Sequence, residues 1–202
     1  MALDTYRPKA DRFIEPIARA FYRASPSQLT VSSLALSGIA GACYYLSLRP
    51  YLIASLVAVA LASLFDALDG KLARMKGVAS KRGDLLDHVI DRFSDIFILA
   101  GLAFSTLGNV ALGLFGMEGV LMTSYMGTQS QALGLGRNYS GIMGRADRLV
   151  LIIVVTVVEI VYPVRYAWYF QITPVTVLLL AFGVLGNYTA VKRFSDAWRS
   201  LG

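Results

Sequence analysis

Four aspartates fall at helical spacing within one stretch of the sequence. Asp66 and Asp69 lie three residues apart, and Asp87 and Asp91 lie four apart. Each pair therefore occupies one face of a helix if its segment is helical. Carboxylate oxygens suit Mg²⁺, Mn²⁺ or Ca²⁺ rather than zinc. Two such ions with an anionic phosphate between them form a site for phosphoryl transfer, so the four aspartates predict a two-metal centre.

The sequence around these aspartates is apolar. No charged residue occurs in residues 54–65, which precede them, or in residues 96–116, which follow. A carboxylate placed inside a bilayer costs about 2.5–3.5 kcal/mol on insertion scales. A divalent metal ion is the simplest group that offsets this cost, which again favours a metal site.

Small residues accompany the aspartates on the same helix faces. Gly70 and Ala73 continue the face of the first pair, and Gly83 lies four residues before Asp87. Small residues let a ligand or a neighbouring helix approach the backbone closely. The aspartates therefore lie beside backbone that a ligand or another helix can approach.

The whole pattern, Asp-x₂-Asp-Gly-x₂-Ala-Arg-x₈-Gly-x₃-Asp-x₃-Asp, resembles the signature of the CDP-alcohol phosphotransferase family. The resemblance implies that Asp66, Asp69 and Asp87 are the core ligands of Mg²⁺ or Mn²⁺, with two ions expected. It implies that Asp91 contacts the second ion and is the catalytic base. It also implies that a CDP-activated lipid is the donor, and that its nucleotide contacts Thr30, Asp69, Gly70, Ala73, Arg74 and Gly83.

The role of Thr30 rests on a shorter match to the same family. Its members often carry Pro-Asn or Pro-Asp with a threonine three residues further on. Here Pro26 and Thr30 fit this pattern, and Ser27 departs from it. The alternative is that this stretch only starts the first apolar helix, capped by Ser25 or Ser27.

The acceptor is predicted from a glycine-rich segment that precedes another apolar stretch. Residues 141–149 include Arg145 and Arg148 and resemble the Arg-x-x-Arg-Leu element of the inositol-phosphate branch of the family. The resemblance implies that these two arginines, together with Arg137, hold the acceptor's phosphate through bidentate contacts. The implied reaction moves a phosphatidyl-type group from CDP-diacylglycerol or CDP-archaeol to inositol phosphate and releases CMP.

Other interpretations stay open at this point. Residues 125–132 lack the basic and acidic residues that relatives often carry. Glycerol phosphate, serine, or CDP-inositol with inositol phosphate are therefore alternative substrates, and the arginines would then only mark topology. A cation channel or transporter that uses the acidic cluster is the alternative from another class of protein, although no inverted repeat is visible.

The composition predicts an integral membrane protein. The 202 residues are 56% hydrophobic, with a mean hydropathy of +0.58, which is more apolar than a soluble domain. We expect an all-α membrane protein with one domain over residues 1–202. It would have an N-terminal amphipathic interfacial helix at 3–24 and six transmembrane helices at about 28–48, 51–75, 83–107, 109–134, 147–167 and 173–194.

The distribution of positive charge predicts the orientation. Of the 19 Lys and Arg, all but Arg49, Arg92 and Arg165 fall on the side of the two termini. This predicts a multi-pass protein of the cell membrane with both termini and the active site in the cytoplasm. Topology and an anionic lipid substrate account for the net charge of +6, so no nucleic-acid partner is expected. Glycines in the third and fourth predicted spans favour a homodimer.

Five further residues are expected to be structural. Asp84 complements the N-terminal dipole of its helix, and Asp95 hydrogen-bonds within the bundle or lines the pocket. His88 is expected to lie off the acidic face. Glu118 is expected to pair with a polar neighbour on another helix. Cys43, the single cysteine, excludes an intramolecular disulfide and is expected to pack in the core.

Overall fold

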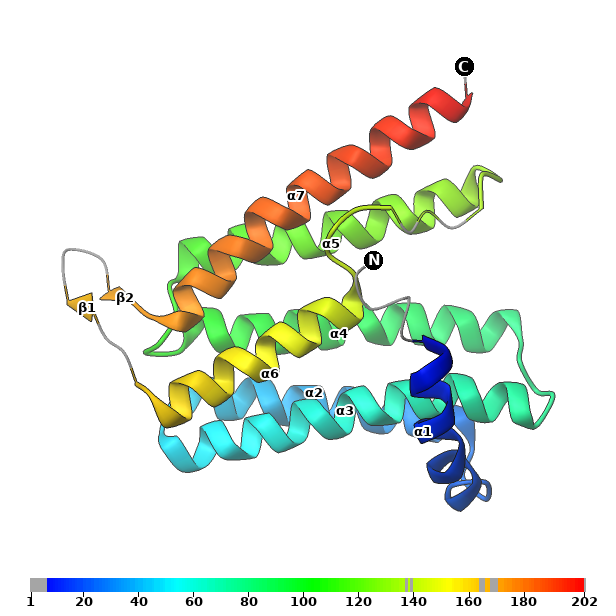
Figure 1. Cartoon of the computed structure of the whole chain (residues 1–202), viewed down its shortest axis with the longest axis horizontal. Coiled ribbons are helices and arrows are strands. Elements are labelled where there is room, and N and C mark those ends of the chain that lie inside the picture. The colour runs from blue at the N-terminus through cyan, green and yellow to red at the C-terminus, as the bar shows by residue number, and fades with distance from the viewer. Residues whose placement is uncertain (1–6, 137, 139, 164–165, 168–170, 202) are drawn as a thin grey trace. The chain divides into compact units, whose positions relative to one another are not determined.

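Seven helices and one short hairpin make up the part of the chain that the computed structural model describes, residues 7–136, 138, 140–163, 166–167 and 171–201. The helices are α1 (Arg7–Ala20), α2 (Pro26–Leu46), α3 (Arg49–Met75), α4 (Lys81–Phe104), α5 (Val110–Ala132), α6 (Arg145–Val161) and α7 (Pro174–Leu201) (Figure 1). Strands β1 (Tyr166–Ala167) and β2 (Gln171–Ile172) pair antiparallel. Contacts divide the chain into an N-terminal unit, Asp4–Gly101, and a C-terminal unit formed mainly by Leu102–Gly202.

The helical prediction is confirmed, and the largest differences from the predicted spans are at the C-terminal ends of α6 and α7. α6 ends at Val161, six residues before the predicted end of the fifth span. Pro163 follows, and proline cannot donate the backbone hydrogen bond that a continuing helix needs. The β1–β2 hairpin was not predicted. α7 runs on to Leu201, past the predicted end at 194, because its last turns contain neither glycine nor proline.

Four of the described helices have the length and composition to cross a membrane. These are α2, α3, α5 and α7. A spanning helix needs about 20 predominantly apolar residues. α6 has only 17 residues, and the first half of α4 is densely charged. The apolar helices indicate a membrane protein, whereas the two remaining spans and the interfacial placement of α1 stay predictions.

The core of the N-terminal unit joins α1, α2 and α3. α2 packs along α3, and α1 packs against α3. Ala18 of α1 is fully buried in a core shared with Leu29 of α2 and with Leu68 and Leu72 of α3. Each of these apolar side chains is removed from water only because the helices meet here. α1 is therefore packed on the helix that carries the first half of the aspartate motif.

Polar contacts tie the N-terminal segment to the same helix. Lys71 Nζ of α3 lies 3.7 Å from Glu15 Oε2 of α1, and Arg19 Nη2 lies 2.8 Å from Glu15 Oε1. The Arg19 hydrogen bond and the charge of Lys71 lower the pKa of the Glu15 carboxyl, so this carboxyl stays ionised at neutral pH. Lys76 Nζ donates to the carbonyl oxygen of Ala24 at 2.8 Å. The segment is thus held at two points near the end of α3.

Two glycines let α2 and α4 cross closely. A Cβ added at Gly101 of α4 would lie 2.1 Å from the carbonyl oxygen of Gly41, and one added at Gly41 of α2 would lie 2.3 Å from that of Phe97. Side chains do not approach backbone oxygens this closely, so both positions require glycine. A Cβ at Gly38, also on α2, would lie 3.8 Å from the Phe97 ring, which is an ordinary van der Waals distance.

Glycines also bring α5 and α7 together in the C-terminal unit (Figure 1). A Cβ added at Gly116 of α5 would lie 2.7 Å from the carbonyl oxygen of Leu179 of α7. Thr123 Oγ1 donates to the carbonyl oxygen of Gly186 at 2.8 Å. The two helix backbones therefore touch directly, and side-chain hydroxyls bond across the contact.

The structure bears on two predictions for these helices. Glu118 accepts a hydrogen bond from Asn187 Nδ2 of α7 at 2.5 Å, which confirms its pairing with a polar helix neighbour.

The glycines of α4 and α5 were expected to permit contact with a second subunit. Gly101 and Gly116 instead pack against other helices of their own unit. These glycines therefore give no support to a particular dimer interface.

We expect Gly101→Ala to destabilise the N-terminal unit, because its methyl group would overlap the Gly41 carbonyl. Overpacking of this kind costs about 1–3 kcal/mol, and thermal unfolding in detergent, followed by circular dichroism, should show a lower midpoint. Gly38→Ala is the matched control and should leave the midpoint unchanged or slightly raised. Equal midpoints for the two variants would contradict the close crossing of α2 and α4.

Candidate active site

The two halves of the aspartate motif lie on consecutive helices joined by a short turn (Figure 1). After α3 ends, Gly77 adopts φ +65°, a left-handed conformation that glycine takes readily. Ser80 then precedes α4, and its Oγ accepts a hydrogen bond from the Gly83 N–H at 3.2 Å. α4 therefore begins at Lys81, two residues before the predicted start, because serine is a strong helix N-cap.

Three aspartates from these two helices converge. One carboxylate oxygen from each of Asp66, Asp69 and Asp87 lies within 4.8 Å of the other two. Asp69 is buried, with 6% of its surface exposed, and the other two are half-buried. The turn between α3 and α4 thus brings together the three residues predicted to be core metal ligands. Their role as ligands stays a prediction.

The chemistry of this cluster fits a divalent cation. Three carboxylates at this spacing repel one another unless cations or protons bind among them. Oδ2 of Asp69 is buried and has no hydrogen-bond partner among the described residues. Oxygen ligands at about 2.0–2.6 Å from a hard cation lie up to about 4–5 Å apart. The three oxygens are therefore spaced as a set of metal ligands would be.

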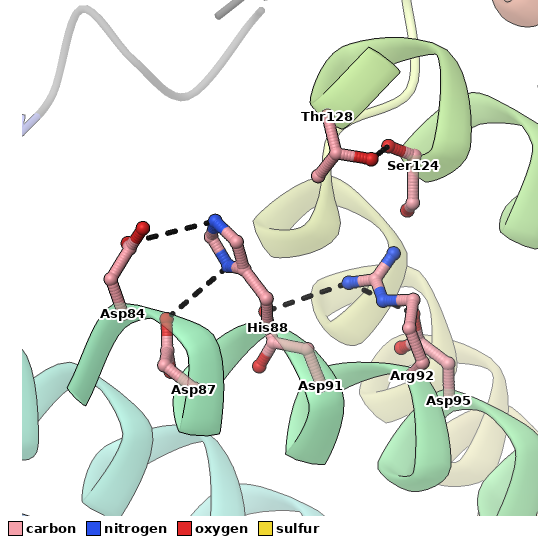
Figure 2. Close-up of polar contacts among 8 residues, drawn as sticks. All are labelled: Asp84, Asp87, His88, Asp91, Arg92, Asp95, Ser124 and Thr128. Atoms are coloured by element: carbon pink, nitrogen blue, oxygen red, sulfur yellow. Dashed lines mark hydrogen bonds and ion pairs between the residues drawn. The ribbon is translucent and has the colours of Figure 1, made fainter. Parts of the chain in front are cut away.

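A second group of possible ligands consists of Asp87, His88 and Asp91, whose ligand atoms also lie within 4.8 Å of one another. His88 Nδ1 lies 3.8 Å from Asp87 Oδ2, and its Nε2 lies 3.6 Å from Asp84 Oδ1 (Figure 2). The prediction that His88 lies off the acidic face is therefore wrong. Asp84 and His88 are four residues apart, a spacing that places both on that face. Asp87 belongs to both groups, which is what we expect of a carboxylate that contacts two metal ions.

Arg92 is part of the site, although the motif does not include it. Its Nη2 lies 3.5 Å from Asp91 Oδ2 and 3.7 Å from Asp95 Oδ2 (Figure 2). Both carboxylates are 6% exposed. Asp95 thus forms an ion pair within its own helix, and its predicted roles in a hydrogen bond of the bundle or in the pocket lining stay predictions. The three-residue spacing of Arg92 and Asp95 was the sequence signal for this contact.

Few atoms lie near the position of an added Cβ at Gly70 and Gly83, two of the predicted nucleotide contacts. Arg74 reaches back along α3, so that its Nη1 lies 3.4 Å from the position of a Cβ at Gly70. Among the described residues this is the only neighbour within 4 Å, and Ser80 Oγ is the only one near a Cβ at Gly83. Ala73, on the same helix, is half-buried. These glycines leave room for a ligand, unlike the glycines at which α2 and α4 cross.

Thr30 lies at the start of α2, next to the aspartate cluster. It is buried, its Oγ1 donates to the carbonyl oxygen of Pro26 at 3.0 Å, and its side chain interacts with Asp69. Gln28 Oε1 accepts a hydrogen bond from the Ser25 N–H at 3.1 Å, which places Ser25 at the helix cap. Ser25 therefore occupies the N-cap position, with the cap hydrogen bond accepted by Gln28, and the contact of Thr30 with a nucleotide stays a prediction.

The predicted acceptor arginines lie at the start of α6, in the C-terminal unit. Asp147 Oδ2 accepts a hydrogen bond from the Gly144 N–H at 2.9 Å, which caps the first turn of this helix. Arg148 is buried, with 3% exposure, and Arg145 is half-buried. Arg137 lies outside the described residues. An arginine that only follows the positive-inside rule is normally exposed to solvent. The burial of Arg148 therefore favours a role in binding or packing.

Arg193 of α7 holds the segment that leads to α6. Its Nη1 donates to the carbonyl oxygen of Thr123 on α5 at 2.6 Å, and its Nε donates to that of Ser140 at 2.9 Å. Ser140 Oγ donates in turn to Asp196 Oδ2 at 2.7 Å. In the sequence Arg193 resembles any other basic residue near a helix end. Only its burial and its contacts show that it positions this segment.

Comparison with known proteins assigns the chain to a family. The sequence matches the CDP-alcohol phosphatidyltransferase family over residues 23–185, and the chain belongs to that family. The match covers both halves of the aspartate motif and the segment that carries Arg145 and Arg148. Because the family is one of enzymes, the match favours an enzyme over the channel or transporter alternative.

Two relatives and one solved fold illustrate the similarity. The chain is 33% identical to the archaetidylinositol phosphate synthase of Pyrococcus horikoshii over 75% of this chain and 80% of that one. It is 28% identical to the synthase of the same name from Methanothermobacter thermautotrophicus over 98% and 95%. Its fold matches phosphatidylinositol phosphate synthase PgsA1 of Mycobacterium tuberculosis with CDP-DAG bound, with TM-score 0.75, 27% identity, and 93% and 94% coverage. A second PgsA1 structure, in complex with manganese and citrate, gives TM-score 0.75 and 27% identity over 92% and 88%.

We expect Asp69→Asn to weaken Mn²⁺ binding by about 10²-fold or more, because even the loss of an outer-shell partner costs about 10–100-fold. Electron paramagnetic resonance of free Mn²⁺ in titrations of the purified protein measures this. Asp84→Asn is the control, since it makes the same change on a largely exposed carboxylate of α4. Asp69 is not a ligand if the two variants bind Mn²⁺ equally well.

Proposed function

We propose that this chain transfers a phosphatidyl-type group from a CDP-activated lipid to inositol phosphate and releases CMP, as a step of phospholipid biosynthesis. The lipid is CDP-diacylglycerol or CDP-archaeol. The observation that carries the proposal is the convergence of Asp66, Asp69 and Asp87 from the two helices that bear the family motif. The CDP-DAG bound to PgsA1 and the names of the two archaeal relatives support the choice of donor and acceptor.

The aspartate cluster would hold the metal. Asp66, Asp69 and Asp87 are the core ligands, and Asp91 completes a site for two ions of Mg²⁺ or Mn²⁺. The manganese found in the PgsA1 complex supports this choice of ion. When bound, such ions neutralise the pyrophosphate of the donor and stabilise the charge that develops during phosphoryl transfer.

The residues around the cluster would bind the nucleotide. Gly70 and Gly83 leave space next to the backbone, and Ala73 adds no bulk on the same helix. Arg74 lies over Gly70 and offers a guanidinium to a phosphate or to the base. Thr30 and Asp69 provide polar groups at the buried end of this space.

Asp91 would act as the general base. The acceptor hydroxyl loses its proton to the Asp91 carboxylate while its oxygen attacks the β-phosphorus of the donor. The new oxygen–phosphorus bond forms as the bond from that phosphorus to the bridging oxygen breaks. CMP leaves with the bridging oxygen, and the lipid phosphate is now esterified to the acceptor.

The arginines of the C-terminal unit would bind the acceptor's phosphate. A phosphomonoester carries about two negative charges at neutral pH, and these charges need cations of their own. Arg145 and Arg148 provide two guanidinium forks three residues apart on α6. The N-terminus of this helix adds a partial positive charge. Arg137 is proposed as a third contact.

We propose the following membrane arrangement on the charge distribution and the helix lengths. One domain, residues 1–202, crosses the cell membrane six times, with α4 and α6 added to the four apolar helices, and α1 lies in the interface. The positive-inside rule places both termini and the aspartate cluster in the cytoplasm. The assembly is proposed to be a homodimer, which mass measurement in lipid nanodiscs can test.

We expect Asp91→Asn to lower kcat by a factor on the order of 10² or more, as for the loss of a general base. The affinity for CDP-lipid should stay close to that of the wild type, because the three core ligands remain. CMP release and binding of CDP-lipid are measured on the same preparation. If binding falls as far as kcat does, Asp91 is mainly a ligand and the base must be sought elsewhere.

The acceptor is tested with a panel of inositol phosphate, glycerol phosphate, free inositol and serine, with CMP release as the signal. We expect inositol phosphate to be used best, and Arg148→Ala to raise its KM strongly while the KM for CDP-lipid stays the same. Arg148→Lys should rescue this only in part, because lysine lacks the bidentate fork.

Arg199→Ala is the matched control for the arginine variants, since Arg199 is exposed in the last turn of α7. It removes the same charge and should leave both KM values unchanged. A preference for free inositol or serine would show that the proposed phosphate pocket is wrong. Equal effects of Arg148→Ala and Arg199→Ala would show that Arg148 does not bind the acceptor.

A further inference from the structure

Arg92 contacts the residue proposed as the base, yet the reaction described above gives it no role. Its Nη2 lies 3.5 Å from Asp91 Oδ2, and the same nitrogen lies 3.7 Å from Asp95 Oδ2 (Figure 2). One guanidinium nitrogen therefore serves two carboxylates on successive turns of α4. The contact with Asp91 joins neighbours in sequence, so the long arginine side chain must fold back along the helix to make it.

The two aspartates are poorly solvated, and Arg92 is half-buried. Asp91 and Asp95 are each 6% exposed, and 29% of the Arg92 side chain is exposed. Nη1 of Arg92 is buried and has no hydrogen-bond partner among the described residues. A guanidinium that is withdrawn from water needs anionic partners. The two aspartates therefore provide the anionic partners of this guanidinium.

The contact engages only one oxygen of Asp91. Asp91 also contributes a ligand atom to the group that includes Asp87 and His88. A carboxylate that must face both a metal-binding group and a reacting hydroxyl has to be held in one orientation. An arginine on Oδ2 restricts the rotation of the carboxylate and directs Oδ1 to its function.

We infer that Arg92, itself held by Asp95, is a positioning residue that fixes the Asp91 carboxylate for proton transfer. The inference rests on the proposed function, in which Asp91 is the base. Arginine suits this task because its planar fork is preorganised and always charged, whereas lysine offers only a flexible point charge. In a merely structural role Arg92 would only neutralise Asp95, and its loss would then reduce the amount of folded protein without changing kcat.

The test compares Arg92→Gln with Arg82→Gln in the purified full-length protein. Arg82 is exposed in the first turn of the same helix, so its replacement removes the same charge without the same contacts. We expect Arg92→Gln to lower kcat by about 10–100-fold, the usual cost of losing a group that orients a functional side chain. The KM for CDP-lipid should stay constant, and Arg82→Gln should keep the wild-type kcat. A kcat of folded Arg92→Gln equal to that of Arg82→Gln would overturn the inference.

Mn²⁺ binding, measured by electron paramagnetic resonance, gives a readout independent of turnover. Arg92→Gln should retain Mn²⁺ binding, because removing a nearby cation does not weaken the attraction of the carboxylates for a divalent ion. Parallel loss of Mn²⁺ binding and kcat would show that Arg92 maintains the whole cluster, and this would contradict a positioning role.

Two further variants keep the inference testable if Arg92→Gln does not fold. Arg92→Lys should recover part of the lost kcat, and full recovery would show that charge alone suffices. Asp95→Asn should lower kcat, and combining it with Arg92→Gln should add little, since the two residues act as a unit. Additive losses would refute the anchoring by Asp95. If the wild type releases no CMP with any acceptor, the proposed function itself fails, and the inference falls with it.

Discussion

Repulsion between carboxylates is the constraint on which the site depends. Asp66, Asp69 and Asp87 come within 4.8 Å of one another, and Asp69 is almost fully buried. At an effective dielectric constant of 20, two unit charges about 4 Å apart repel by about 4 kcal/mol. Three such pairs would rival the whole stability of a typical domain, which is about 5–15 kcal/mol. The cluster therefore persists only with bound cations or protons, and in the proposed function divalent ions meet this requirement.

Glycine serves two opposite purposes around this cluster. Gly41 and Gly101 allow two helix backbones to touch, and no side chain would fit there. Gly70 and Gly83 have only the tip of a side chain nearby, so they leave space that a ligand can occupy. The first pair fixes where α4 lies along α2, and the second pair keeps the resulting site open. Glycine thus permits the tight crossing of α2 and α4 at one pair of positions and leaves space for a ligand at the other pair.

The sequence predicted the helices and the aspartate cluster because both depend on short-range spacing. It did not predict the early end of α6, because apolar residues continue past Pro163 and the predicted span was extended through them. It misplaced His88 and gave Arg92 no role because the motif specifies only the aspartates, although helical spacing places Asp84 four residues before His88 and Asp95 three after Arg92. The glycines expected to form a dimer interface pack within the chain, and spacing cannot distinguish these two uses.

The proposed reaction requires that a divalent ion held by these aspartates binds the pyrophosphate of a CDP-lipid. The most direct test is the ³¹P hyperfine coupling to Mn²⁺, measured by pulsed electron paramagnetic resonance on the purified protein with CDP-lipid. The account predicts a resolved ³¹P coupling that is absent in Asp69→Asn and present in Asp84→Asn. Bound Mn²⁺ without any ³¹P coupling, or a coupling that survives in Asp69→Asn, would contradict it.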